Sequence, residues 1–361
     1  YIYIPVQEAE KGNSNENKFA MCLLNIKWWL NIAIYTLFMH LGLSTATLLR
    51  QLYYNRDGKS NWMATLAQSA GFPVLFPYYC ISQSVDHTTT GIKPNHKFEV
   101  TVALAYAILG VFLAADCVMC SIGLLYLSAS TFSIICGSQL AFNAFFSFFI
   151  HSPKCTSVLN SLFLFTIFST LLIFKTDSAY PFKQNYTIVV PCIFIASAVY
   201  GFMFFLTHFS LRKLVKRETY EVVLNRTLYQ SLIATCAALV GFLGSGQWKG
   251  IKREMEEFEL GKLSYITTLI EMAITSQVFS IGAVGFILEV SSLFSGVIRV
   301  LELPFVPILA IMYSQNGIMD VITFLALILG MWGFVSYAYG YYLDVFRHHV
   351  RQVSKLPLLE G

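Results

Sequence analysis

The segment from Val100 to Ile150 constrains the fold most, because Asp116 is its only Asp, Glu, Lys or Arg residue. As one helix it would extend about 75 Å, whereas the hydrocarbon core of a bilayer is about 30 Å thick. The segment is therefore expected to fold back on itself, with a turn near 126–128. A second apolar run of the same length, 263–313, is expected to turn near 289–292.

The composition excludes the main classes of soluble protein. Apolar residues make up 56% of the chain and charged residues 12%, whereas soluble domains carry about 25% charged residues. So few charges cannot cover the surface of a 361-residue soluble enzyme, and a net charge of +4 is too small for a nucleic-acid partner. We therefore expect an all-α membrane protein that crosses the lipid bilayer several times.

Ten stretches are long and apolar enough to be transmembrane helices, which need about 20 residues. They lie at 28–49, 62–82, 99–122, 128–150, 156–174, 186–211, 227–247, 264–288, 291–313 and 319–343. The two long runs hold the third and fourth span of each group of five. Matching halves of this kind are typical of transporters with internal repeats. Because five is odd, the second half enters the membrane from the opposite side, and the two five-helix repeats are expected to be inverted.

The expected organisation has five parts. They are a polar cytoplasmic N-terminal tail (1–26), the first repeat (27–174), a linker loop (175–185), the second repeat (186–343) and a cytoplasmic C-terminal tail (344–361). Of the 24 Lys and Arg residues, fourteen fall on the side of the termini, nine on the other side and one inside a span. This count places Arg50 and Arg226 in loops. Since basic loops stay in the cytoplasm, we expect a multi-pass plasma-membrane protein with both termini cytoplasmic. The loop at 248–262 is expected to be a solvated amphipathic segment.

Asp116 is the most unusual polar residue in the expected spans, because no basic residue lies within ten positions of it. Acidic side chains inside a membrane are costly and usually face the bundle interior or a water-filled cavity. Desolvation disfavours the charged carboxylate, which suits Asp116 to accept and release a proton. A purely structural hydrogen bond is the open alternative. Glu271 is the second candidate for proton coupling. Arg299 and Glu302, three residues apart, are interpreted as a local ion pair.

A polar stripe runs along the fourth span. Gln139, Asn143 and Ser147 are spaced by four residues and so share one helix face. A carboxamide offers a donor and an acceptor side by side, which is the pairing that reads a nucleobase edge. Gln277 and Gln68 place the same group in two other spans. Hydrogen bonds between helices are the structural alternative for each of these residues.

Other motifs carry little chemistry. Cys117 and Cys120 have metal-site spacing, but no second Cys or His pair accompanies them. Paired His or Asp motifs that would hold a catalytic metal are absent, as is the GxxxxGK[ST] motif for ATP. The sequence therefore predicts no metal, no cofactor and no enzymatic activity. Tyr200 and Phe204 place aromatic rings on one face of the sixth span, where they could sandwich a flat ring.

Seven short stretches resemble the plant purine permease family, within the drug/metabolite transporter superfamily. They occur in the family's order over about 28–343 and are Gln68–Pro73, Leu124–Thr131, Ser138–Phe149, Gln277–Gly285, Ser291–Ser295, Leu303–Pro307 and Trp332–Tyr337. The resemblance implies a proton-coupled secondary active transporter. Its expected substrates are purine bases, cytokinins or related nitrogen heterocycles, imported through a central cavity.

The resemblance also implies functional residues. Asp116 falls at the family's aspartate position, and it is expected to couple protons together with Glu271. The expected substrate-binding residues are Gln68, Ser138, Gln139, Asn143, Tyr200 and Gln277.

Two departures from the family bear on the substrate. Cys117 stands where the family resemblance leads us to expect asparagine, and Ser276 where it leads us to expect tryptophan. Loss of an aromatic ring beside Gln277 alters how a purine would stack. An alkaloid-preferring permease of the same fold is therefore an alternative. A receptor or sensor that binds such ligands without flux is the alternative from a different class.

Overall fold

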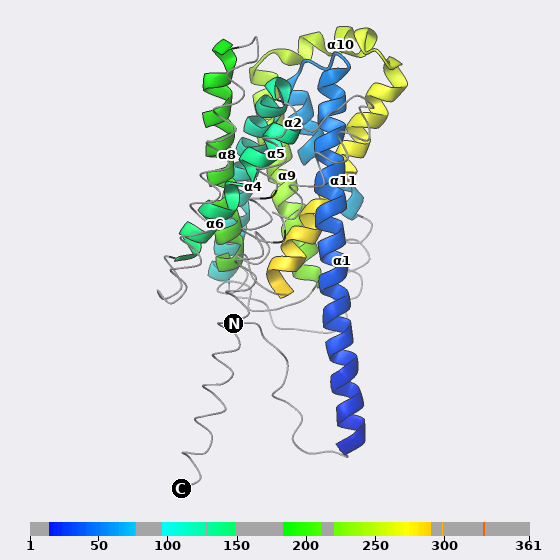
Figure 1. Ribbon diagram of the computed structural model, residues 1–361, viewed down its shortest axis with the longest axis vertical. Coiled ribbons are helices and arrows are strands. Elements are labelled where there is room, and N and C mark those ends of the chain that lie inside the picture. Colours follow the sequence, from blue (N-terminus) through cyan, green and yellow to red (C-terminus); the bar gives the residue numbers. More distant parts are fainter. Residues whose placement is uncertain are drawn as a thin grey trace.

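The computed structural model describes residues 14–76, 96–127, 129–148, 183–210 and 220–289, together with the single positions 298 and 328. Every regular element in this described part is a helix, as expected for an all-α protein. Figure 1 shows these helices as an upright bundle, with the N-terminal part of α1 extending below the others.

Five long helices are apolar enough to cross a membrane within the described part. They are α1 (Ser14–Asn55), α4 (His96–Tyr126), α8 (Lys183–Phe209), α9 (Tyr220–Gly244) and α11 (Gly261–Glu289). They coincide with the predicted first, third, sixth, seventh and eighth spans. Apart from positions 298 and 328, the fifth, ninth and tenth predicted spans lie outside the described residues. The count of ten and the inverted repeat therefore stay predictions.

The outer faces of these helices are apolar. Leu104 and Val111 on α4, Ile188 on α8 and Val240 on α9 are each more than half exposed. A soluble protein rarely exposes large apolar side chains on so many of its helices. These side chains therefore indicate the faces that contact lipid in a multi-pass membrane protein.

Two predicted spans are interrupted. The second is divided into α2 (Asn61–Ser69) and a 3-10 turn, η1 (Phe72–Leu75), because Pro73 lacks the N–H that would continue the helix. The fourth is divided into α5 (Ala129–Cys136) and α6 (Gln139–Phe148). The predicted turn near 126–128 is confirmed, since α4 ends at Tyr126 and α5 begins at Ala129.

Two glycines bring α1 and α11 into backbone contact. A Cβ atom on Gly42 would lie 2.6 Å from the backbone nitrogen of Phe279, and one on Gly282 would lie 2.7 Å from that of Met39. Small residues allow this close approach of helices in membranes. Through it, α1 and α11 form the most extensive helix pair among the described elements.

A polar cap closes one end of the bundle, where η4 (Gln247–Gly250) and α10 (Ile251–Glu257) cross the end of α1 (Figure 1). Glu254 is buried and accepts hydrogen bonds from the hydroxyls of Tyr53 and, at 3.3 Å, Tyr265. The loop at 248–262 is therefore solvated on one face only.

Ion pairs on the surface of the cap join it to the loop after α1. Arg56 contacts Glu259 at 2.5 Å, and Lys59 contacts Glu257 at 3.1 Å. A hydrogen bond from Arg253 lowers the pKa of the Glu257 carboxyl, and the bond from Lys59 lowers it further. The cap thus fixes the ends of α1 and α11 to one another.

Candidate substrate cavity

A cavity lies among the long helices, between segments that belong to both halves of the chain. Its wall comes from α1, α2, α4 and α5 of the first half and from α8, α9 and α11 of the second. Its volume is about 70 Å³, and on the same measure one water molecule needs about 10–15 Å³. The cavity therefore has room for several water molecules.

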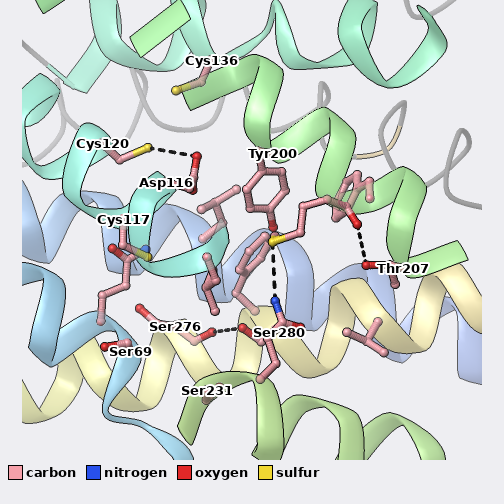
Figure 2. Close-up of a pocket in the computed structure, with 18 of the residues that line it drawn as sticks. Ser69, Asp116, Cys117, Cys120, Cys136, Tyr200, Thr207, Ser231, Ser276 and Ser280 are labelled. Atoms are coloured by element: carbon pink, nitrogen blue, oxygen red, sulfur yellow. Dashed lines mark hydrogen bonds between the residues drawn. The ribbon is translucent and has the colours of Figure 1, made fainter. Parts of the chain in front are cut away.

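Asp116 lies in the α4 side of this wall, with 6% of its surface exposed. The Cys120 thiol donates to its Oδ1 atom at 3.8 Å, and Cys117 and Cys136 line the same region (Figure 2). The carboxylate is thus buried in protein but adjoins open space. This is the setting in which acidic residues are usually found in membrane proteins.

Two of the predicted substrate-binding residues line the cavity in the described structure. Gln68 enters the wall from α2 and Tyr200 from α8. The Tyr200 ring packs edge-on against Phe204, with centroids 4.9 Å apart, and lies 6.4 Å from the ring of Phe279. Figure 2 shows Tyr200 across the cavity from Ser276, the position where the family resemblance leads us to expect tryptophan.

The other four predicted binding residues do not line this cavity. Ser138, Gln139 and Asn143 are buried, and the backbone of α6 at Gln139 and Asn143 meets Gly201 of α8. Gln277 faces α9, and its Oε1 atom accepts a hydrogen bond from Ser231 at 3.1 Å. The described structure therefore does not bring these four residues to the cavity surface.

The two predicted proton-coupling residues are also separated. Asp116 lines the cavity, whereas Glu271 is an exposed residue on α11 and is not part of the cavity wall. Thr275 donates to the backbone carbonyl of Glu271 at 2.7 Å, which is an ordinary bond within a helix.

Two buried arginines in the wall were not predicted as site residues. Arg50 and Arg226 are 3% and 1% exposed, and both line the cavity. Their assignment to loops was wrong, because α1 continues to Asn55 and α9 begins at Tyr220. An Nη atom of Arg226 donates to Thr207 Oγ1 at 2.5 Å.

A signal for this wall was present in the sequence. Arg226 and Gln230 are four residues apart, and both line the cavity. Thr227, Ser231 and Thr235 follow the same spacing beside them on α9. This second row has the same length and spacing as the stripe on the fourth span, and its middle residue, Ser231, also lines the cavity.

Several buried polar atoms of the wall have no hydrogen-bond partner among the described residues. They are Arg50 Nε, Gln68 Oε1, Arg226 Nε and Ser276 Oγ. An unsatisfied buried donor or acceptor costs about 1–3 kcal/mol. Their residues, together with Asp116, make the wall polar, which suits it to a small polar molecule. No group of three or more His, Cys, Asp or Glu residues that could hold a metal occurs in the described part.

Comparison with known proteins identifies the family of this chain. A family model described as "Purine nucleobase transmembrane transport" matches residues 30–346. The chain is 43% identical to purine permease 21 of Arabidopsis thaliana, over 99% of this chain and 92% of that protein. It is 46% identical to probable purine permease 10 of the same plant, over 94% of this chain and 88% of that protein.

A solved structure titled "Crystal structure of protein" is similar in fold, with a TM-score of 0.50. It covers 84% of this chain and 98% of its own, and the two share 14% sequence identity. Since the relatives matched by sequence are permeases, the prediction that the chain is not an enzyme is confirmed. The resemblance predicted from the seven short stretches is confirmed as well. The chain is a multi-pass membrane protein that belongs to the purine permease family.

Proposed function

We propose that the chain is a proton-coupled secondary active transporter that imports purine bases, cytokinins or related nitrogen heterocycles. The observation that carries this proposal is the cavity, which has a buried carboxylate and several other polar side chains in its wall. Transporters bind their substrates at the interface between their repeats, and this wall is built from both halves of the chain. The family to which the chain belongs supports a purine nucleobase as the substrate.

Proton coupling is proposed at Asp116. Protonation removes the charge of a carboxylate that adjoins the cavity, and this change alters the relative energies of the inward-facing and outward-facing states. A ligand or proton shifts such an equilibrium only by its differential affinity for the two states. Glu271 is the second candidate, and it would have to act from the outer surface of α11.

Substrate contacts are proposed for all six predicted binding residues. Gln68 and Tyr200 contact the heterocycle in the described arrangement, since both line the cavity. Ser138, Gln139, Asn143 and Gln277 contact it only after α6 or α11 has moved during the transport cycle. The proposal also places the protein in the plasma membrane, with both termini in the cytoplasm.

Uptake of labelled adenine into liposomes that contain the purified protein tests the proposal. Uptake is expected to rise when the outside is acidified and to collapse when a protonophore is added. Asp116→Asn is expected to abolish the pH dependence while substrate binding persists. Glu256→Gln, which changes an exposed acid in the cap, is the matched control and should leave the pH dependence unchanged.

The same assay separates the alternatives. Accumulation that ignores both pH and protonophore would reject proton coupling, and binding of adenine without accumulation would indicate a receptor. A panel of unlabelled purines, cytokinins and alkaloids as competitors would identify an alkaloid-preferring permease.

A further inference from the structure

Two cysteines of the cavity wall are in contact with one another. Cys120 belongs to α4 and Cys136 to α5, and both line the cavity. A hydrogen bond joins their side chains, and Figure 2 shows them next to one another. Both are free, half-buried thiols, whereas Cys117 of the same wall is buried. A small reagent that enters the cavity can therefore reach this pair.

The contact between the two thiols favours a disulfide. Such a bond needs the sulfur atoms about 2 Å apart and the Cβ atoms about 3.5–4.5 Å apart. Thiols that already share a hydrogen bond need only a small shift to meet these conditions. Cys120 and Cys136 are sixteen positions apart, on either side of the turn that joins α4 to α5. The bond would therefore cross-link two consecutive helices.

We propose that Cys120 and Cys136 are a redox-sensitive thiol pair, which a peroxide converts to a disulfide that inhibits transport. Hydrogen peroxide oxidises one thiol to a sulfenic acid and is reduced to one water molecule. The second thiol then displaces the hydroxyl group of the sulfenic acid, which leaves as a second water molecule while the S–S bond forms. A dithiol reductant reverses the reaction by thiol–disulfide exchange.

Cys120 is the thiol that reacts first. Its S–H group donates to Asp116 Oδ1 at 3.8 Å, and the thiolate is the form of cysteine that attacks. An adjacent base activates such a nucleophile, so the carboxylate takes the proton as the sulfur attacks the peroxide. The proton then passes to the hydroxide that leaves, which completes the first water molecule. Hydrogen peroxide is only slightly larger than water, and the cavity has room for several waters.

The disulfide acts on two features of the proposed transport cycle. Cys136 is the last residue of α5, and only Gly137 and Ser138 separate it from α6. A bond to α4 fixes this end of α5 and so restrains the movement of α6 on which the proposed substrate contacts depend. The bond also removes the S–H donor of Cys120 from Asp116. The inhibition therefore rests on the proposed function, whereas formation of the disulfide does not.

Treatment of the purified protein in liposomes with hydrogen peroxide tests both parts. Mass spectrometry of unreduced peptides is expected to show Cys120 linked to Cys136. Uptake of labelled adenine is expected to fall several-fold in the treated wild type and to recover with dithiothreitol. Cys120→Ser and Cys136→Ser should each lack the linked peptide and keep their own uptake after treatment. Cys236→Ser, at an exposed cysteine of α9, is the matched control and should respond like the wild type.

The peptide and the uptake decide different parts of the proposal. Absence of the link in folded, treated protein would overturn the thiol pair, as would a link of Cys120 or Cys136 to another cysteine in its place. A link without loss of uptake, or a loss that persists in both serine variants, would overturn the inhibition. Untreated protein that takes up no purine would overturn the proposed function and the inhibition with it, while the linked peptide still decides whether the disulfide forms. If a serine variant is not monodisperse, the wild-type peptide and the recovery with dithiothreitol decide.

Discussion

Replacing Gly282 with alanine is expected to weaken the contact between α1 and α11. The added Cβ atom would lie 2.7 Å from the backbone nitrogen of Met39, 2.8 Å from the carbonyl oxygen of Tyr35 and 2.9 Å from Phe38 Cβ. Two of these three atoms belong to the backbone, so a side-chain rotation cannot relieve the clash. The helices must separate by several tenths of an ångström.

Two opposing effects set the change in stability caused by Gly282→Ala. Overpacking of a well-packed contact costs about 1–3 kcal/mol. Alanine in place of glycine within a helix gains about 1 kcal/mol. Gly244→Ala provides the matched control, because its Cβ atom would meet nothing within 4 Å. The difference in stability between the two variants therefore approximates the cost of the clash, about 1–3 kcal/mol, which corresponds to a melting temperature lower by roughly a few degrees.

Thermal unfolding of purified protein in detergent, followed by size-exclusion chromatography, measures this difference. Gly42→Ala should behave like Gly282→Ala, because its Cβ atom would lie 2.6 Å from the backbone nitrogen of Phe279. The double variant should lose less than the sum of the two, since a helix pair that has separated for one methyl group accommodates the second. A Gly282→Ala protein that melts at or above the Gly244→Ala control would refute this description of the contact.

Two further predictions concern the cap. Glu254→Ala removes the shared acceptor of two buried tyrosine hydroxyls and should lower the free energy of unfolding by about 1–3 kcal/mol. Glu256→Ala, at an exposed acid, is the control and should change it little. Equal losses in melting temperature for the two variants would contradict the role of the buried bonds. The pKa of Glu257 is lowered from its ordinary value of 4.5, first by the bond from Arg253 and then by that from Lys59. Its stabilisation is therefore present above pH 4.5 and lost as pH falls through the lower pKa of the folded state. Glu257→Gln should flatten the fall in melting temperature below pH 4.5, and an unchanged fall would contradict this assignment.

Hydropathy located the long helices because a run of apolar residues has one stable location, the bilayer, and one stable form, the helix. The fold-back after Tyr126 also follows from the length of the run that ends at Ile150. The division of the fourth span into α5 and α6 is different, because no proline lies at the break and only Gly137 and Ser138 separate the two helices. Such breaks depend on neighbouring segments, which a hydropathy average does not describe.

The site was harder to predict than the helices. A charge count assigns every arginine near the end of a predicted span to a loop. The helices that hold Arg50 and Arg226 extend beyond the predicted span ends, so both residues are helical, and both are buried. The rotation of a helix about its axis is set by packing against its neighbours. Gln139 and Asn143 are therefore absent from the cavity wall, and their backbone meets α8, while Arg226 and Gln230 of α9 line the cavity.

The cap and the glycine contact together constrain how the cavity can open. Glu254 bridges Tyr53 of α1 and Tyr265 of α11, and the backbones of these helices touch at Gly42 and Gly282. The three elements α1, α10 and α11 therefore form one unit, which contributes one side of the cavity wall. A transport movement that keeps these bonds would occur at the boundary of this unit with α2, α4, α8 and α9. Asp116 lies on the α4 side of that boundary, so such a movement would change the surroundings of its carboxylate.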